Sequence, residues 1–350
     1  MKRQKLVAIV LMSVTLLVFT FAAAGAQTKE GWPKTISIGV PSVGSSPYIV
    51  YAGLGEMMRK HLGVTGTAEA VGGSTSIVAL MSRGQLQFGQ VSTDTLYDAV
   101  RGVKNYKGKK VELRQITPGI AFAMYFFVRS NAGITKPEEV RGKRLLCYSP
   151  TASIMTLMGG LLLESVGMTK KDVIAMPVIS QPDAVRALTD NTADGFIHAG
   201  SPVSPVSSFA EMANSIDARL VPITEQQQKF MVKKSNGILT PSEIAGGQYK
   251  GNPNPTRTVA FDVPLVTMPS MPESLVYEMT KLIYGKKYRN EFLGLHPAAK
   301  AFFDVKRLEA EPPLTPYHAG AIRFYKELGV WTKKMDEYQR AVLKELGAKE

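Results

Sequence analysis

Short apolar, β-branched runs alternate along the chain with stretches whose apolar residues recur every three or four positions. This alternation predicts strands and helices in turn, the pattern of an α/β fold with a parallel sheet. In the first third of the chain the predicted strands cover residues 35–40, 67–71 and 88–91. The helices predicted after them cover residues 51–62, 77–81 and 96–100.

Two further β-type runs, residues 113–116 and 123–128, are continuous rather than alternating, as in strands buried on both faces. A second α/β unit follows, with strands at residues 143–148, 194–199 and 219–223 and a helix at residues 155–166. A stretch rich in Gly, Pro and Asn, residues 246–255, precedes a strand at 258–263, and beyond Pro272 the pattern is helical.

This order predicts two α/β lobes joined by crossing strands. We expect one lobe to comprise residues 27–125 together with 259–350, including the C-terminal helices, and the other to comprise residues 126–258. The crossings are expected near residues 122–129 and 258–267.

The amino terminus has the pattern of a signal peptide. Lys2, Arg3 and Lys5 precede an apolar stretch that runs to Phe21, and the small residues Ala24-Gly25-Ala26 precede a polar segment. We therefore expect cleavage after Ala26 and a periplasmic mature protein. A membrane anchor is the alternative, because the stretch is nearly long enough to span a bilayer.

The amino-acid composition excludes several classes of function. The 350 residues are 45% hydrophobic, which suffices for sizeable cores. The 42 Lys and Arg outnumber the 29 Asp and Glu, but they are spread along the chain without a groove-reading motif, so no nucleic-acid partner is expected. Cys147 is the only cysteine and the four histidines are scattered, which predicts neither a disulfide nor a metal site.

Motifs of the common enzyme classes are missing from the sequence. It contains no G-x-S-x-G, H-E-x-x-H or G-x-x-x-x-G-K-[ST], and no G-x-G-x-x-G after a strand. We expect no catalytic residue and no cofactor.

Small polar loops follow several predicted strands, where open α/β sheets bind ligands. They cover residues 44–46, 72–75, 92–94 and 150–153, and their hydroxyls and helix-starting N–H groups suit a small anion. Asp94 is the only carboxylate among them; it either caps a helix or contacts an amino group of the solute. The candidate ligand-binding residues are Ser45, Ser46, Tyr48, Gly73, Ser74, Thr75, Ser92, Thr93, Asp94, Tyr148, Thr151, Ser153, Phe196 and His198.

The order and spacing of several segments resemble the TAXI family of TRAP-transporter solute-binding proteins. The segments that carry the likeness are residues 38–48, 72–77, 84–99, 134–144, 194–197, 296–300 and 316–321. The resemblance implies a two-lobe periplasmic-binding-protein fold of the type II kind, with the cleft between the lobes. It also implies a receptor, most simply a monomer, that captures a dicarboxylate or glutamate-like anion by hinge closure and delivers it to a TRAP membrane permease.

Three departures from the family pattern fall in the predicted ligand loops. Residues 45–49 stand where the family usually has Gly-Thr-Tyr-Tyr-Pro, Ser92 replaces the usual glutamine, and residues 151–154 replace Gly-Ser-Gly-Thr. The resemblance therefore supports the family's fold for this chain better than it supports the family's solutes. An exported enzyme on the same scaffold, or a receptor that serves a sensor or another transporter, remains an alternative.

Overall fold

The computed structural model describes residues 29, 31–150, 152–303, 307–310 and 312–349. The predicted signal peptide and its cleavage site lie outside these residues. A short unit that ends at Trp32 is separate from a compact unit that runs from Pro33 to Glu350, and everything below concerns the second unit. Among the described residues, no helix is long and apolar enough to cross a membrane.

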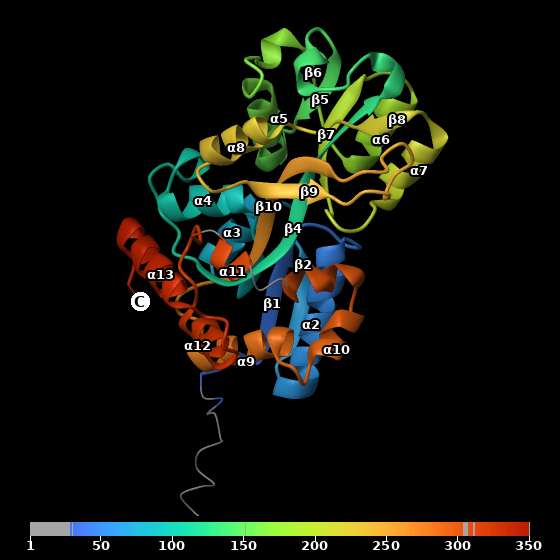
Figure 1. The fold of residues 1–350 in the computed structure, drawn as a ribbon. Coiled ribbons are helices and arrows are strands. Elements are labelled where there is room, and N and C mark those ends of the chain that lie inside the picture. Colours follow the sequence, from blue (N-terminus) through green and yellow to red (C-terminus); the bar gives the residue numbers. More distant parts are fainter. Residues whose placement is uncertain (1–28, 30, 151, 304–306, 311, 350) are drawn as a thin grey trace, which may run out of the picture. The chain divides into compact units, whose positions relative to one another are not determined.

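The described strands form one sheet with the order β2-β1-β3-β10-β4-β7-β5-β6, in which β8 lies beside β4 and β9 beside β10 (Figure 1). The strands are β1 (Thr35–Val40), β2 (Thr65–Ala70), β3 (Phe88–Gln90), β4 (Arg114–Arg129), β5 (Arg144–Tyr148), β6 (Ile174–Pro177), β7 (Gly195–Gly200), β8 (Ala218–Leu220), β9 (Thr240–Ile244) and β10 (Thr256–Thr267).

Helices flank this sheet. They are α2 (Ser46–Leu62), α3 (Ser74–Ser82), α4 (Thr93–Arg101), α5 (Ser153–Glu164), α6 (Gln181–Thr189), α7 (Ser207–Ser215), α8 (Glu225–Lys234), α9 (Glu273–Tyr284), α10 (Arg289–Gly294), α11 (Arg307–Ala310), α12 (Ala319–Glu327) and α13 (Lys333–Leu346). The expected helical C-terminal part is confirmed by α9 to α13.

Strand β4 joins the two lobes. Residues 114–123 pair with β10, and residues 123–128 pair with β7, so one strand belongs to both halves of the sheet. The sequence predicted two separate runs here, and that prediction was wrong because Gly119 lets the strand continue through an irregularity. Gly119 has a positive φ of 70°, and a Cβ there would lie 2.0 Å from the carbonyl oxygen of Val263 on β10.

The two-lobe α/β fold predicted from the sequence is confirmed. Strands β1, β3, β5, β7 and β10 lie where the apolar runs placed them; β1 has its predicted bounds, and no end of the others differs by more than four residues. Strands β6 and β9 and helices α6, α7 and α8 were not predicted.

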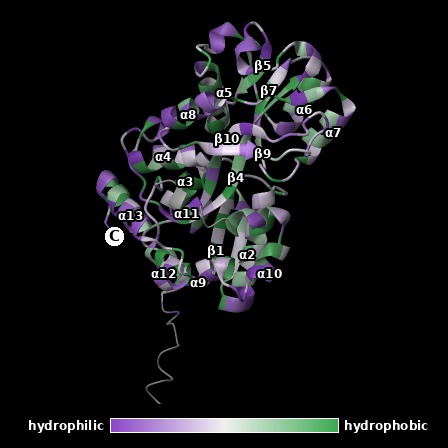
Figure 2. Ribbon diagram, in the orientation of Figure 1, coloured by the Kyte–Doolittle hydropathy of each residue, from purple (hydrophilic) through white to green (hydrophobic). Residues whose placement is uncertain are grey.

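Apolar side chains pack between the sheet and the helices. One core is continuous from α3 and α4 to α5, and includes Val78, Leu96 and Met158. Another lies under α6 and α7, around Phe127 and Phe209. Figure 2 shows hydrophobic residues along much of β4 and β7, as expected for strands covered on both faces.

Helix α5 packs closely on β5 through a glycine. A Cβ at Gly159 would lie 1.9 Å from the carbonyl oxygen of Cys147, whereas a Cβ at the adjacent Gly160 would meet nothing within 4 Å. The closeness of α5 to the sheet therefore depends on Gly159 and not on Gly160.

Gly159→Ala should destabilise the protein by about 1–3 kcal/mol or more, because the methyl group forces α5 away from the sheet. Gly160→Ala is the matched control, and should leave stability unchanged or raise it by up to about 1 kcal/mol through helix propensity. Urea denaturation of both variants measures the difference. Equal midpoints for the two variants would contradict the close contact.

Candidate functional site

The loops at the carboxyl ends of the strands face one another across the middle of the shared strands. Strand β10 is antiparallel to both β3 and β4, and β7 is antiparallel to β4. Strands β1 and β2 run parallel to β3, while β5 and β6 run with β7. The carboxyl ends of β1–β3 therefore point toward the other lobe, and those of β5–β7 point back (Figure 1).

The pairing register gives the spacing between these two sets of strand ends. Gln90 at the end of β3 lies level with Leu265, which pairs with Thr117 of β4. Gly200 at the end of β7 pairs with Ala123 of β4. The distance from Thr117 to Ala123 along an extended strand is roughly 20 Å, and the candidate loops lie in this interval.

Two of the predicted loops meet within the first lobe. The Oγ of Ser74, the first residue of α3, accepts hydrogen bonds from the Ser92 backbone N–H at 2.9 Å and from the Ser92 hydroxyl at 3.0 Å. Helices α3 and α4 therefore begin side by side, with their N–H ends and hydroxyls at the same edge of the sheet.

Two hydrogen bonds connect this edge with the other lobe. The hydroxyl of Ser153, the first residue of α5, donates to the Asp94 carboxylate on α4. The hydroxyl of Thr93 donates to the backbone oxygen of Ile238 at 3.0 Å. The structure thus brings the 92–94 loop against Ser153, two groups that the sequence singled out from segments 59 residues apart.

The interpretation of Asp94 as a helix cap was wrong. Ser92 occupies the cap position of α4, and Asp94 lies in the first turn. Asp94 is only 2% exposed, and its Oδ1 oxygen has no hydrogen-bond partner among the described residues. A negative charge in the first turn still interacts favourably with the helix dipole.

The remaining candidates in the first lobe lie at or near helix starts. Ser45 caps α2: its Oγ accepts from the Tyr48 N–H at 3.3 Å and donates to the Ser42 carbonyl oxygen at 2.8 Å. Ser46 and Tyr48 are half-buried, and Thr75 is exposed near the start of α3. Gly73 precedes α3 as an exposed cap with no side chain.

Candidates in the second lobe are more dispersed. Tyr148 ends β5, where the Lys170 Nζ lies 4.3 Å from its ring centroid, and Thr151 lies outside the described residues. Phe196 is fully buried among aromatic side chains of the second core, and so packs in the core rather than lining a wall of the site. His198 faces the same core, with its ring centroid 5.7 Å from that of Phe209.

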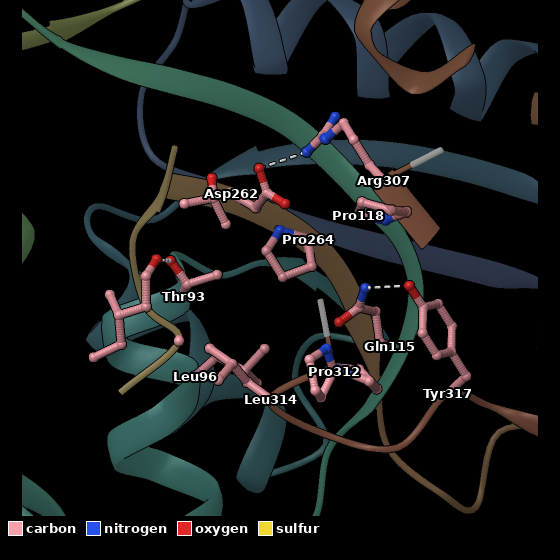
Figure 3. Close-up of a pocket in the computed structure, with 14 residues that line it drawn as sticks. Thr93, Leu96, Gln115, Pro118, Asp262, Pro264, Arg307, Pro312, Leu314 and Tyr317 are labelled. Carbon is pink, nitrogen blue, oxygen red and sulfur yellow. Dashed lines mark hydrogen bonds and ion pairs between the residues drawn. The ribbon is translucent and has the colours of Figure 1, made fainter. Parts of the chain in front are cut away.

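A small cavity beside the crossing strands was not predicted from the sequence (Figure 3). It measures about 60 Å³ and is lined by Thr93, Leu96, Gln115, Pro118, Gly237, Ile238, Thr240, Asp262, Pro264, Arg307, Pro312, Pro313, Leu314 and Tyr317. That volume holds a few water molecules. The acidic residue Asp262 within the apolar run of β10 could have indicated a polar site here. Its partner Arg307 is distant in sequence, so the pair could not be identified from the sequence.

Polar groups in this cavity bind one another. The Arg307 Nη2 lies 2.6 Å from the Asp262 Oδ1, and the Gln115 amide donates to the Tyr317 hydroxyl oxygen at 2.8 Å (Figure 3). These pairs join the C-terminal segment to β4 and β10. The loop hydroxyls and helix starts are therefore better suited than this cavity to take a solute.

The chemistry of the loops is that of binding. Helices α2, α3, α4 and α5 all begin at carboxyl ends of strands, and their N–H groups can donate to an anion. Among the described residues, no group of three His, Cys, Asp or Glu side chains could hold a metal ion.

The chain matches the model of a known protein family. The model of the family described as NMT1-like matches residues 38–329, most of the described chain.

Solved structures with a similar course of the chain include binding proteins of transport systems. The aliphatic sulphonate binding protein SsuA from Escherichia coli is 12% identical, with 89% of this chain and 88% of that chain covered and a TM-score of 0.45. A binding protein component of an ABC phosphonate transporter from Pseudomonas aeruginosa is 12% identical, with 89% and 95% covered and a TM-score of 0.48. A Xanthomonas citri protein bound to ATP is 14% identical, with 89% and 100% covered and a TM-score of 0.49.

Stability should fall as the pH decreases below neutrality. Burial lowers the pKa of His198 and of His318, so both imidazoles are neutral in the folded protein at neutral pH. A histidine with a depressed folded pKa contributes stability above its unfolded pKa of about 6.5, and this contribution is lost as the pH falls.

In His198→Gln, the loss of unfolding free energy between about pH 7.5 and pH 5 should be smaller than in the wild type, because one of the two histidines is gone. Urea denaturation across that pH range measures it. An identical pH dependence in wild type and variant would show that His198 is not held neutral by burial.

Proposed function

The chain belongs to the NMT1-like family, and from this premise we propose that it is an exported receptor that binds a small organic anion between its two lobes. The observation that carries the proposal is the opposed arrangement of the strand ends. Helix N-termini and hydroxyls from both lobes lie in the same interval of β4, where a solute can contact both.

Lobe closure is the proposed mechanism of capture. Strands β4 and β10 cross between the lobes and can bend while the loops on each side stay rigid. A solute that touches Ser74 and Ser92 on one side and Ser153 on the other favours the closed arrangement. Closure excludes water, and each hydrogen bond to the solute becomes stronger in the drier site.

The sign of the solute's main charge follows from the loop chemistry. The starts of α2, α3 and α5 carry no acidic side chain in their first turns. Their dipoles and N–H groups favour negative charge. A carboxylate, sulfonate or similar anionic group is therefore the proposed common feature of the solutes.

The transport partner is proposed from the sequence segments that resemble the TAXI family. In this proposal the protein is periplasmic and monomeric, and delivers its solute to a TRAP membrane permease rather than transforming it. Uptake of labelled solute into vesicles that hold the permease subunits should require this protein. Uptake that is independent of the protein would contradict the delivery role.

Calorimetric titration with carboxylates, amino acids and sulfonates tests the binding function. At least one solute should bind, raise unfolding free energy by about 2.7 kcal/mol at one hundred times its dissociation constant, and be recovered chemically unchanged. Binding by none of them, or chemical conversion of the solute, would contradict the proposal.

Ser46→Ala should weaken binding of that solute about tenfold, because one hydrogen bond to an anion is lost at the start of α2. Ser82→Ala is the control, since Ser82 is the last residue of α3 and its hydroxyl donates to the Val78 carbonyl oxygen at 2.8 Å. Wild-type affinity in Ser46→Ala, with an unchanged melting transition, would remove the first loop from the site.

A further inference from the structure

Asp94 is a buried carboxylate with one unused oxygen. It is 2% exposed, and the Ser153 hydroxyl from the other lobe donates to its Oδ2. Its Oδ1 has no hydrogen-bond partner among the described residues. None of the ion pairs between described residues includes Asp94. The carboxylate therefore lies where the two lobes touch through Ser153, and among the described residues it has no cation as a partner.

Burying the Asp94 carboxylate in this way costs free energy unless a hydrogen-bond donor lies beside its Oδ1. A buried charge without a partner loses its hydration, and a buried acceptor without a donor adds to that cost. The dipole of α4 offsets only part of this cost, because the N-terminus of a helix carries a partial positive charge and not a full one. A cationic donor at Oδ1 would remove the rest.

Two neighbouring groups make this position more favourable to a cation. Asp98 lies one turn further along α4, on the same face, and its Oδ1 is also buried without a partner. Burial raises the pKa of Asp98, and the charge of Asp94 raises it further, against the effect of Lys104 at 3.0 Å. The negative charge of Asp98 is therefore partly neutralised by Lys104, whereas the charge of Asp94 has no cationic partner among the described residues.

Tyr106 adds a third buried oxygen. Its hydroxyl has no hydrogen-bond partner among the described residues. Burial, together with the charges of Asp98 and Asp94, raises the pKa of Tyr106 to about 12. The phenol is neutral at physiological pH, and its oxygen can accept a hydrogen bond.

We propose that the Asp94 carboxylate binds the ammonium group of the solute, so that the natural solute is an amine-bearing acid, such as an amino acid or an aminosulfonate. This inference rests on the proposed function, and it assigns the two ends of the solute. The anionic end lies against the starts of α2, α3 and α5, and the ammonium end lies against Asp94.

An ammonium group fits better than a metal ion. An ammonium donates up to three hydrogen bonds, and Asp94, Asp98 and Tyr106 offer acceptors of that kind. Metal ions that prefer oxygen take six or more ligands, and the described residues hold no group of three acidic or other metal-binding side chains.

Matched pairs of solutes that differ in the amino group test the inference. Calorimetry compares L-glutamate with glutarate, and taurine with ethanesulfonate. In at least one pair the amine should bind about tenfold tighter or more to the wild type, as expected for a charge-assisted hydrogen bond. Equal or tighter binding of the deaminated members would overturn the inference and leave the proposed function standing. Binding of none would overturn both.

Asp94→Asn should remove the preference within the pair, lowering the affinity for the amine about tenfold or more and leaving that for the deaminated acid nearly unchanged. Glu211→Gln is the charge-matched control on the exposed surface of α7, and should bind both as the wild type does. A preference that persists in Asp94→Asn would place the ammonium elsewhere and contradict the assignment. The wild-type comparison decides the inference even where Asp94→Asn fails to fold.

Discussion

The pairing of β4 with β10 is the constraint on which the rest of the structure depends. Both strands extend through the two halves of the sheet. Along one edge β4 pairs with β10 up to Ala123, and along the other edge it pairs with β7 from Ala123 onward. Because β7 runs against β4, the strands of the second half are reversed relative to those of the first. The carboxyl ends of the two halves are thereby opposed, and the same two strands that oppose them can act as the hinge. Gly119 maintains the close approach of β4 and β10 at the irregular part of the ladder.

Most of the scaffold could be predicted from local patterns, and the exceptions have physical reasons. Runs of β-branched and apolar residues located β1, β3, β5 and β10, because such residues favour buried strands. Strand β9 was missed because Pro241 and Glu243 are unusual in strands, yet it is tolerated as an edge beside β10. Strand β4 was divided in two because Pro118-Gly119 reads as a turn, whereas pairing on both sides keeps the chain extended.

The site was predictable where it depends on loop chemistry and not where it depends on strand faces. Hydroxyl-rich turns after strands identified Ser74, Ser92 and Ser153; in the fold Ser92 is hydrogen-bonded to Ser74, and Ser153 to Asp94. Phe196 and His198 lie within β7 and share the face of that strand beneath α7, which no local signal reveals. Asp94 is a candidate contact of the solute because it is buried and its Oδ1 has no hydrogen-bond partner among the described residues. Both are properties of the folded chain.

The central claim is that the two lobes close around a solute by bending at β4 and β10. Val43 and Val203 are 72% and 74% exposed on the loops after β1 and β7, and Cys147 is only 1% exposed. Spin labels on cysteines placed at these two valines therefore report the distance between the lobes without interference. Electron–electron double resonance should give a shorter distance when a solute identified by calorimetry is saturating. The same distance distribution with and without solute would contradict the account.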